Sequence, residues 1–200
     1  MLEFWQQRYS EEGYAYGDRP NVFFKQVLDG LEPGKILLPA EGEGRNSVYA
    51  ALKGWQVDAY DFSEQAVEKA LEFADKHQVS INYIQSSHSE LMNRFKQDYD
   101  AIALIYAHVP NDIRESFHRQ LLTLLKPGGY FMMEAFTTEQ ITRSSGGPKD
   151  INMLYTLDQV RSDFEKLCQL NLLEAVTEVL DEGKYHVGEA HFIRMLAVKK

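Results

Sequence analysis

The sequence predicts an α/β protein with a parallel sheet that ends in an antiparallel pair of strands. Through the middle of the chain, short apolar runs alternate with amphipathic stretches, which is the pattern of successive βα units. Two further apolar runs end the chain with no helix between them, so we expect them to pair antiparallel. With 200 residues, 44% of them hydrophobic, the chain can bury one sizeable core, and we expect a single domain over residues 1–200.

Five strands and four helices are expected before Phe136. The strands are expected at Lys35–Leu38, Gln56–Asp61, Ile81–Gln85, Tyr99–Ile105 and Tyr130–Ala135. The helices are expected at Ser47–Lys53 and Ser63–His77, as a short piece after Ser89, and at Asn111–Leu125. Ser63 and Asn111 stand where an N-cap oxygen would accept free backbone N–H groups, and the KPGG run at Lys126–Gly129 stops the last of these helices.

Beyond Phe136 the pattern changes. The segment from Thr137 to Asn152 is polar, contains Gly and Pro, and is too long for a simple connection, so it predicts a loop of the kind that often covers a site. Thr156 followed by Gln159 forms a capping box that opens a helix to about Leu167. The closing strands are expected at Leu172–Leu180 and His191–Lys199, joined through DEGKYHVGEA.

Composition excludes several classes of protein. Cys168 is the only cysteine, which excludes an internal disulfide framework and a clustered thiolate metal site. No apolar run approaches the roughly 18 residues of a membrane span, and the start MLEFWQQRYSEEG lacks the features of a signal peptide, so we expect a cytoplasmic protein. The formal net charge of -9 disfavours nucleic acid as a partner. The six histidines form no close pair with a carboxylate in a helical ligand arrangement, so no metal site is expected.

The first strand leads into a glycine turn. In KILLPAEGEGRNSVYAA, Gly42 and Gly44 lie between the strand and the next helix, where residues without a Cβ let backbone N–H groups approach a ligand. Asp61 ends the second strand, where an acid in such folds accepts hydrogen bonds from the two ribose hydroxyls of an adenosine ligand. Alone, each feature has an ordinary interpretation as a tight turn or a helix-entry acid. Together they indicate a ligand crevice at the carboxyl ends of neighbouring strands.

The acids of this turn bear on which adenosine ligand it holds. Glu41 and Glu43 flank Gly42 and would repel the pyrophosphate of a dinucleotide unless Arg45 compensated. The dinucleotide fingerprint would also require Gly or Ala where Ser47 stands. S-adenosylmethionine has no phosphate and carries a sulfonium and an ammonium cation. The sequence therefore favours S-adenosylmethionine as the cofactor.

Four segments carry a family resemblance over nearly the whole chain. They are GEGRNSVYAALKGWQVDAYD at Gly42–Asp61, IYAHVP at Ile105–Pro110, LLKPGGY at Leu124–Tyr130 and the C-terminal EGKYHVGEAHFIRMLAVKK. With them the chain resembles class I S-adenosylmethionine-dependent methyltransferases, particularly the bacterial tellurite-resistance methyltransferases and more distantly the thiopurine methyltransferases. The resemblance implies a Rossmann-like, seven-stranded, mostly parallel sheet with an antiparallel last strand and helices on both faces. The number of strands expected above agrees with it.

The resemblance also implies a set of cofactor-binding residues. They are Trp5, Tyr16, Ala40, Glu41, Gly42, Gly44, Asn46, Asp61, Phe62 and Ser87. In this set Asp61 takes the place of the ribose acid, and Phe62 would lie against the adenine. Ser87 stands where many relatives have an adenine-binding Asp, while Leu38 and Ala40 stand where many have an acid and a glycine.

Two segments are expected to cover the site. Residues 1–33 contain FWQQRY and YAYGDRPN, which resemble family segments that fold over the cofactor, and aromatic side chains there would attract cations and cover apolar ligands. A flap that only packs on the domain is the alternative. The loop 137–155 would cover the acceptor site. Within it, Arg143 either orients an anionic acceptor or is simply solvated.

Tyr106 and His108 are the candidate catalytic residues. They follow the fourth strand, where sites form in open α/β sheets, and the resemblance places them facing the methyl group and the acceptor. The alternatives are core packing for Tyr106 and a helix-entry residue bonded to the backbone for His108. Methyl transfer from a sulfonium mainly requires positioning, so a base is needed only when the acceptor must lose a proton.

The sequence thus predicts an S-adenosylmethionine-dependent methyltransferase that acts on a small acceptor, with a soft sulfur, selenium or tellurium nucleophile favoured. Two alternatives remain open at this point. One is a non-catalytic regulator that binds adenosine or S-adenosylmethionine, and the other is a nicotinamide-dependent oxidoreductase. We expect no nucleic-acid or membrane partner, and a monomer or homodimer.

Overall fold

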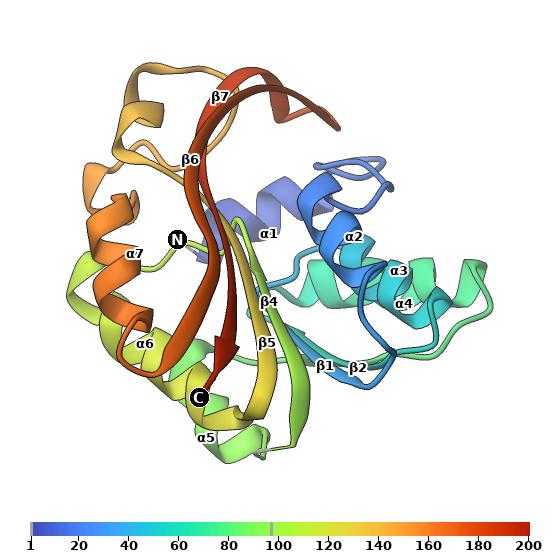
Figure 1. The fold of residues 1–200 in the computed structure, drawn as a ribbon. Helices are drawn as coiled ribbons and strands as arrows, with labels where there is room; N and C mark the ends of the chain where they lie inside the picture. The colour runs from blue at the N-terminus through green and yellow to red at the C-terminus, as the bar shows by residue number, and fades with distance from the viewer. Residues whose placement is uncertain (1, 97) are drawn as a thin grey trace.

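Seven strands form one mixed sheet in the order β3-β2-β1-β4-β5-β7-β6 in the computed structural model, which describes residues 2–96 and 98–200 (Figure 1). Within this described sheet, only β7 runs antiparallel to its neighbours, β5 and β6. The expected seven-stranded, mostly parallel sheet with an antiparallel last strand is therefore confirmed. The strand order reverses between β1 and β4, which is where open α/β sheets form their ligand crevice.

The elements have the following bounds. The strands are β1 (Lys35–Pro39), β2 (Gln56–Asp61), β3 (Asn82–Gln85), β4 (Tyr99–Ile105), β5 (Leu125–Phe136), β6 (Cys168–Glu182) and β7 (His186–Lys199). The helices are α1 (Leu2–Ser10), α2 (Val22–Leu28), α3 (Arg45–Leu52), α4 (Glu64–Lys76), α5 (Leu91–Arg94), α6 (Asn111–Leu124) and α7 (Leu157–Phe164). Three 3-10 turns, η1 (His88–Glu90), η2 (Thr138–Thr142) and η3 (Ile151–Met153), complete them.

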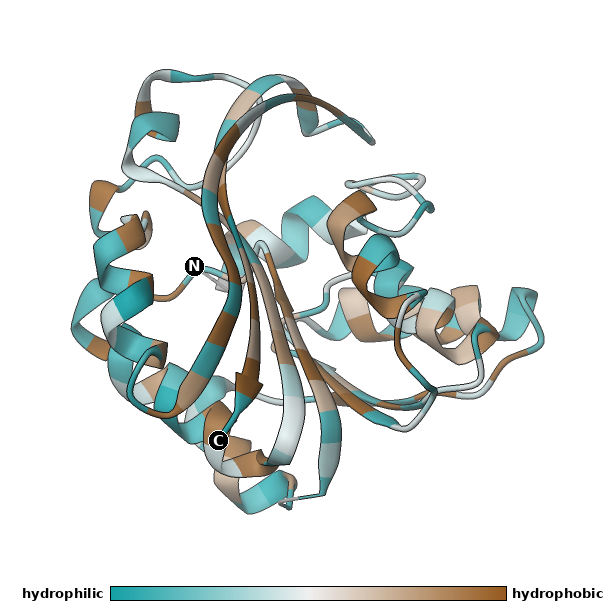
Figure 2. Cartoon of the chain, in the orientation of Figure 1, coloured by the Kyte–Doolittle hydropathy of each residue, from teal (hydrophilic) through white to brown (hydrophobic). Residues whose placement is uncertain are grey.

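Helices cover both faces of the sheet, as Figure 1 shows. Helices α2, α3 and α4 lie on one face, where Phe24, Trp55 and Phe73 belong to one hydrophobic cluster with the strands. Helices α5, α6 and α7 lie on the other, where Phe117 and Phe164 belong to a second cluster. Figure 2 shows many hydrophilic residues along α6 and α7. None of the described helices is long and apolar enough to cross a membrane.

Several expected elements are confirmed to the residue. Strands β2 and β4 have the bounds that their apolar runs predict, because five or more consecutive positions in each are buried or nearly so. Ser63 caps α4 by accepting a hydrogen bond from the Ala66 N–H at 3.4 Å. The capping box of Thr156 and Gln159 opens α7, although the helix ends at Phe164 and not at Leu167.

Two expectations around α6 are wrong. Pro110, and not Asn111, is the N-cap residue of this helix, and the Asn111 side chain instead accepts a hydrogen bond from Arg114 Nη1 at 2.8 Å. The strand that was expected to begin at Tyr130 begins at Leu125. The KPGG run therefore follows the end of the helix, as expected, but lies within β5.

The closing hairpin is much longer than the sequence predicts. Strands β6 and β7 begin and end further out than Leu172–Leu180 and His191–Lys199, and most of DEGKYHVGEA is strand. The actual turn is short, and Gly183 in it has φ +66°. A Cβ at Gly183 would stand 2.3 Å from the backbone nitrogen of Gly17, so only glycine lets the turn pack on the N-terminal segment. The hairpin therefore reaches across the carboxyl ends of the parallel strands.

Candidate functional site

A cavity of about 690 Å³ opens at the carboxyl ends of β1, β2, β4 and β5. This volume is typical of small-molecule sites, which span roughly 300–1,000 Å³. The cavity wall includes ten of the residues named from the sequence: Trp5, Tyr16, Ala40, Glu41, Gly42, Asn46, Asp61, Phe62, Tyr106 and His108. The structure thus brings most of the expected site together at the reversal of strand order.

Gly44 and Ser87 are the two named residues that do not line the cavity. Gly44 is the N-cap of α3 and faces α4, where an added Cβ would stand 2.7 Å from the Ala70 Cβ. The lack of a Cβ at Gly44 therefore permits close packing of α3 on α4. Ser87 caps the η1 turn in a capping box with Glu90, and the next residue, His88, reaches the cavity instead. The binding roles of Gly44 and Ser87 therefore stay predictions.

Hydrogen bonds with two neighbouring residues fix the conformation of the glycine turn. Gly42 has φ +66°, its N–H donates to Asp61 Oδ2 at 3.0 Å, and its carbonyl accepts the Tyr83 hydroxyl at 2.7 Å. An added Cβ would stand 2.8 Å from the Tyr9 hydroxyl oxygen. The turn therefore requires glycine both for its conformation and for its space.

Glu41 occupies the N-terminus of α3. Its Oε1 accepts the backbone N–H groups of Asn46 and Ser47, each at 2.8 Å. This explains why α3 begins at Arg45, earlier than expected, because the capping oxygen comes from a residue upstream of the N-cap Gly44. Burial raises the pKa of Glu41 to about 7. The helix N-terminus that would hold a dinucleotide pyrophosphate is thus already capped by a carboxyl group, which disfavours the nicotinamide alternative.

Glu43 ties the N-terminal segment to the turn. Its carboxylate accepts the Ala15 N–H at 2.7 Å and pairs with Lys69 at 2.9 Å. The Lys69 ammonium also donates to the carbonyl groups of Glu11 and Gly13 at 2.7 Å. The acid therefore holds the segment after α1 against the cavity, and its charge is compensated within the protein.

Asp61 retains capacity for a ligand. It is 3% exposed, and its two oxygens accept the N–H groups of Gly42 and Ser63, at 3.0 and 2.9 Å. Burial raises the pKa of this carboxyl to about 6. The Phe62 backbone N–H also acts on this carboxyl, but a carboxylate offers about four lone-pair sites, so an acceptor position remains for a ligand. Phe62 follows it on the same wall.

The side chains of Tyr106 and His108 have different environments. Tyr106 has φ +52°, its ring stacks on Phe136 at 4.7 Å between centroids, and its hydroxyl is buried. His108 Nδ1 lies 2.6 Å from the Met153 carbonyl, and its Nε2 accepts the Phe136 N–H at 3.1 Å. Burial lowers the pKa of His108 to about 4. Both ring nitrogens are therefore engaged by the backbone, which favours the structural alternative for His108, and its catalytic role stays a prediction.

His186 is a cavity residue that the sequence reasoning missed. Its ring lies 4.4 Å from the Tyr16 ring and 4.7 Å from the Tyr106 ring. Nδ1 faces Glu182 Oε2 at 3.5 Å, and no described residue bonds Nε2. Burial lowers the pKa of His186 despite this partner, so the imidazole is neutral near pH 7. The longer hairpin places it here, and the expected strand start at His191 had left it in a connection.

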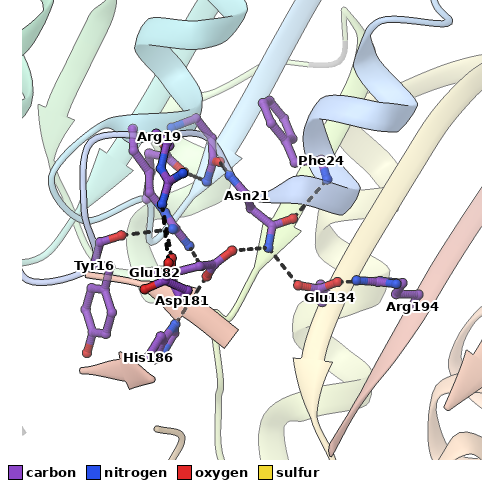
Figure 3. A network of polar contacts seen from close by, with 12 residues as sticks. Tyr16, Arg19, Asn21, Phe24, Glu134, Asp181, Glu182, His186 and Arg194 are labelled. Atoms are coloured by element: carbon purple, nitrogen blue, oxygen red, sulfur yellow. Dashed lines mark hydrogen bonds and ion pairs between the residues drawn. The ribbon is translucent and has the colours of Figure 1, made fainter. Parts of the chain in front are cut away.

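A buried polar network anchors this imidazole (Figure 3). Glu182 pairs with Arg45 at 3.0 Å and accepts Asn21 Nδ2 at 3.3 Å. Burial pushes the pKa of Glu182 upward, but His186 and Arg45 together lower it to about 2. Figure 3 shows Asn21 bridging to Glu134, whose other oxygen accepts Arg194 Nε at 2.7 Å. The network connects the N-terminal segment, α3 and the last three strands.

Both segments that were expected to cover the site contribute residues to the cavity wall, and their covering roles stay predictions. From α1, Trp5 stacks on Tyr9 at 5.4 Å between ring centroids, and both rings line the cavity. From the loop, residues 144, 146–150 and 153 line the opposite part of the wall. Arg143 is not among the lining residues and is paired with Glu189 of β7. No group of three or more metal-ligating side chains occurs among the described residues.

The sheet order, the glycine turn and the acid at the end of β2 make this domain similar to class I S-adenosylmethionine-dependent methyltransferases. Residues 36–129 match the family model described as "Methyltransferase domain". A Bacillus subtilis (strain 168) protein named "Putative methyltransferase YqeM" is 30% identical over 115 residues, which is 55% of this chain and 45% of that protein. The chain therefore spans less than half the length of this curated relative.

Solved structures share the fold over the whole chain. A structure titled "Conversion of a Disulfide Bond into a Thioacetal Group during Echinomycin Biosynthesis" superposes with a TM-score of 0.78 and 15% identity, covering 100% of this chain and 92% of that one. TehB from Haemophilus influenzae superposes with a TM-score of 0.75 and 18% identity, covering 100% and 67%. At these identities the likeness establishes the architecture, and the acceptor has to be argued from the site.

Proposed function

We propose that this chain transfers the methyl group of S-adenosylmethionine to a small acceptor with a soft sulfur, selenium or tellurium nucleophile. The observation that carries the proposal is the cavity between the glycine turn and His186, whose wall includes residues of α1, the closing hairpin and the loop 137–155. A cavity with such a wall suits a compact acceptor, because a polymer would need an open groove. Of the two similar structures, one has a title that describes the conversion of a disulfide bond into a thioacetal group, which is sulfur chemistry, and the other is TehB from Haemophilus influenzae.

The half of the cavity at β1 and β2 fits the cofactor. Asp61 would hold the ribose hydroxyls with its remaining lone pairs, and Phe62 would lie against the adenine. Gly42 lines this half of the cavity beside Asp61. Trp5 and Tyr16 would cover the bound cofactor from the N-terminal segment. When bound, the cofactor supplies an electrophilic methyl group on a sulfonium.

The half of the cavity at β4 and β5 fits the acceptor. Tyr106, Phe136 and His186 form an aromatic wall there. Polarizable nucleophiles pack well against such rings. With Nδ1 directed at the Glu182 carboxylate, we assign the proton of neutral His186 to Nδ1, so the Nε2 lone pair is free to take a proton from an acceptor such as a thiol. An acceptor that is already anionic would need only positioning.

Methyl transfer from labelled S-adenosylmethionine to a panel of acceptors tests this proposal. The panel should contain thiols, selenite- and tellurite-derived species, small oxygen and nitrogen acceptors, RNA and protein. We expect turnover on the chalcogen compounds. Turnover on RNA or protein alone would refute the small-acceptor proposal.

The same labelled cofactor and acceptor panel distinguish a methyltransferase from a non-catalytic regulator. A non-catalytic regulator would be stabilised by S-adenosylmethionine and by S-adenosylhomocysteine but would transfer no methyl group to any acceptor. An oxidoreductase would instead show a rise in melting temperature with a nicotinamide cofactor, which the capped N-terminus of α3 argues against. A crystal structure with S-adenosylhomocysteine would locate every contact directly.

A further inference from the structure

Arg8 of α1 projects a positive charge onto the cavity wall. Its Nη1 donates to the Tyr16 hydroxyl at 3.1 Å. The guanidinium carbon lies 3.5 Å from the centroid of the Tyr185 ring and 4.7 Å from that of Phe4. Among the described residues, Arg8 forms no ion pair with a carboxylate. The guanidinium is therefore held in place by rings and a hydroxyl, and its nearest acidic influence is Glu11, which is bonded to Lys184 and Tyr185 and makes no ion pair with Arg8.

The other cations of the cavity wall are engaged elsewhere. Arg45 pairs with Glu182 at 3.0 Å and donates to the Tyr16 carbonyl at 3.0 Å. The Lys149 ammonium donates to the carbonyl of Arg143. In a chain of net charge -9, an arginine that is held in place beside a cavity without an ion pair to a carboxylate is an unusual placement. A planar guanidinium recognises a carboxylate through paired N–H donors, and the Tyr16 hydroxyl adds a further donor beside it.

The position of Arg8 indicates which end of the cofactor it would meet. Asp61 marks the ribose side of the cavity at the end of β2. Arg8 contacts Tyr16 and Tyr185, and Tyr16 packs on His186 near the ends of β4 and β7. A cofactor with its ribose at Asp61 and its methyl group toward β4 directs its amino-acid end to this side.

We propose that Arg8 and the Tyr16 hydroxyl form a carboxylate-binding subsite, occupied by the carboxylate of the cofactor's amino-acid moiety. The inference rests on the proposed function, because it takes the cofactor's orientation from Asp61. A carboxylate of the acceptor has the same chemistry and is the other possible source. The two sources can be separated with ligands that lack the group.

Calorimetry with two nucleosides tests the subsite. S-adenosylhomocysteine carries the carboxylate, and 5′-methylthioadenosine lacks the whole amino-acid moiety. We expect Arg8→Gln to weaken S-adenosylhomocysteine binding at least tenfold and to change 5′-methylthioadenosine binding less than twofold. Arg8→Lys should recover part of the loss. Arg19→Gln is the matched control, because Arg19 lies in the same N-terminal segment with an 80% exposed side chain and should change neither affinity.

Each of the other outcomes of the Arg8→Gln experiment leads to a different conclusion. If Arg8→Gln leaves S-adenosylhomocysteine binding unchanged but raises KM for 3-mercaptopropionate and not for 2-mercaptoethanol, the subsite serves the acceptor's carboxylate and the cofactor assignment is overturned. Equal loss of both nucleosides would mean that Arg8 only supports the fold of α1, and no effect on any ligand would remove the subsite altogether. Failure of the wild-type chain to bind either nucleoside would count against the proposed function instead. Circular dichroism of each variant excludes unfolding.

Discussion

The backbone N–H of Gly42 donates a hydrogen bond to the Asp61 carboxylate at 3.0 Å. This bond joins the turn after β1 to the end of β2, so two parts of the cavity wall are held in one arrangement. Asp61 therefore fixes the glycine turn, and under our proposal it also offers its remaining lone pairs to a ligand. Substitutions at either residue should affect binding for different reasons.

The first prediction concerns Asp61→Asn. The amide keeps one acceptor oxygen but places an NH₂ group where the carboxylate accepted a backbone N–H. Hydrogen bonds to a charged group contribute about 1.5–3 kcal/mol, so we expect affinity for S-adenosylhomocysteine to fall roughly 10- to 100-fold. Calorimetry on the folded variant measures it. Unchanged affinity would mean that the ribose binds elsewhere.

The second prediction concerns pH. Burial raises the pKa of Asp61 to about 6, and the ligand's ribose donors and cations favour the charged form, so cofactor affinity should fall as pH drops from 7.5 through 6. Below 6 the fall can approach tenfold per pH unit. Because the folded pKa is raised, protonation of Asp61 stabilises the free protein. This contribution is present in full below the ordinary pKa and is lost as pH rises through about 6.

A pH series on Asp61→Asn separates this carboxyl from Glu41, whose pKa is raised to about 7. We expect the variant to lose the part of the pH dependence centred near 6. If wild type and variant give the same profile, the dependence belongs to Glu41 or another group and not to Asp61.

The third prediction concerns Gly42→Val. The substitution places a β-branched side chain at φ +66° and against the Tyr9 hydroxyl, so it should abolish measurable binding of S-adenosylhomocysteine. Gly128→Val is the matched control, because Gly128 has φ +78° with nothing within 4 Å of its added Cβ. Both variants bear a backbone cost of about 1–3 kcal/mol, but only the first should lose the ligand. Retained binding in a folded Gly42→Val variant would remove the glycine turn from the site.

Much of the sheet could be predicted because its central strands are buried on both faces. The runs at Gln56–Asp61 and Tyr99–Ile105 are apolar along almost their whole length, and the helix caps at Ser63 and Thr156 use local hydrogen bonds that a short sequence window contains. Asp61 and the glycine turn follow directly from these boundaries.

The remainder depends on contacts between distant segments. Strand β6 lies at the edge of the sheet and most of its side chains are partly exposed, so its sequence has no long apolar run to mark its ends. The position of His186 in the site depends on that strand length. The start of α3 depends on Glu41, which lies outside the usual capping position. The network of Glu182 and Arg45 spans 137 positions of sequence and has no local signal.

The fourth prediction concerns the network of Glu134 and Arg194. The Glu134 side chain is 1% exposed and pairs with Arg194 Nε at 2.7 Å. Arg194→Met would leave a buried carboxylate without its charged partner, so we expect a loss of about 3–5 kcal/mol in the free energy of unfolding. Urea denaturation measures it. Arg119→Met, which breaks an exposed pair with Glu115, should cost less than about 1 kcal/mol. Similar losses for the two would contradict the assignment of a stabilising network.

The fifth prediction separates His186 from His108. His186→Gln should lower kcat/KM by roughly 10²–10⁴-fold for an aliphatic thiol that must lose its proton, and much less for an aromatic thiol that is already ionised. The acid limb of the wild-type profile for the aliphatic thiol should lie below pH 6.5. His108→Gln should mainly lower the melting temperature, since both of its nitrogens bond the backbone. The reverse pattern would assign the proton transfer to His108.

Ala40 and Tyr106 have φ of +49° and +52°, and they follow the neighbouring strands β1 and β4 at the cavity. A conformation of this kind costs a non-glycine residue about 1–3 kcal/mol, so the scaffold maintains both at the expense of its own stability. The substitution Ala40→Gly could therefore recover part of that energy, because glycine adopts positive φ without the same cost. Relieving the strain at position 106 in the same way would remove the Tyr106 side chain from the cavity wall.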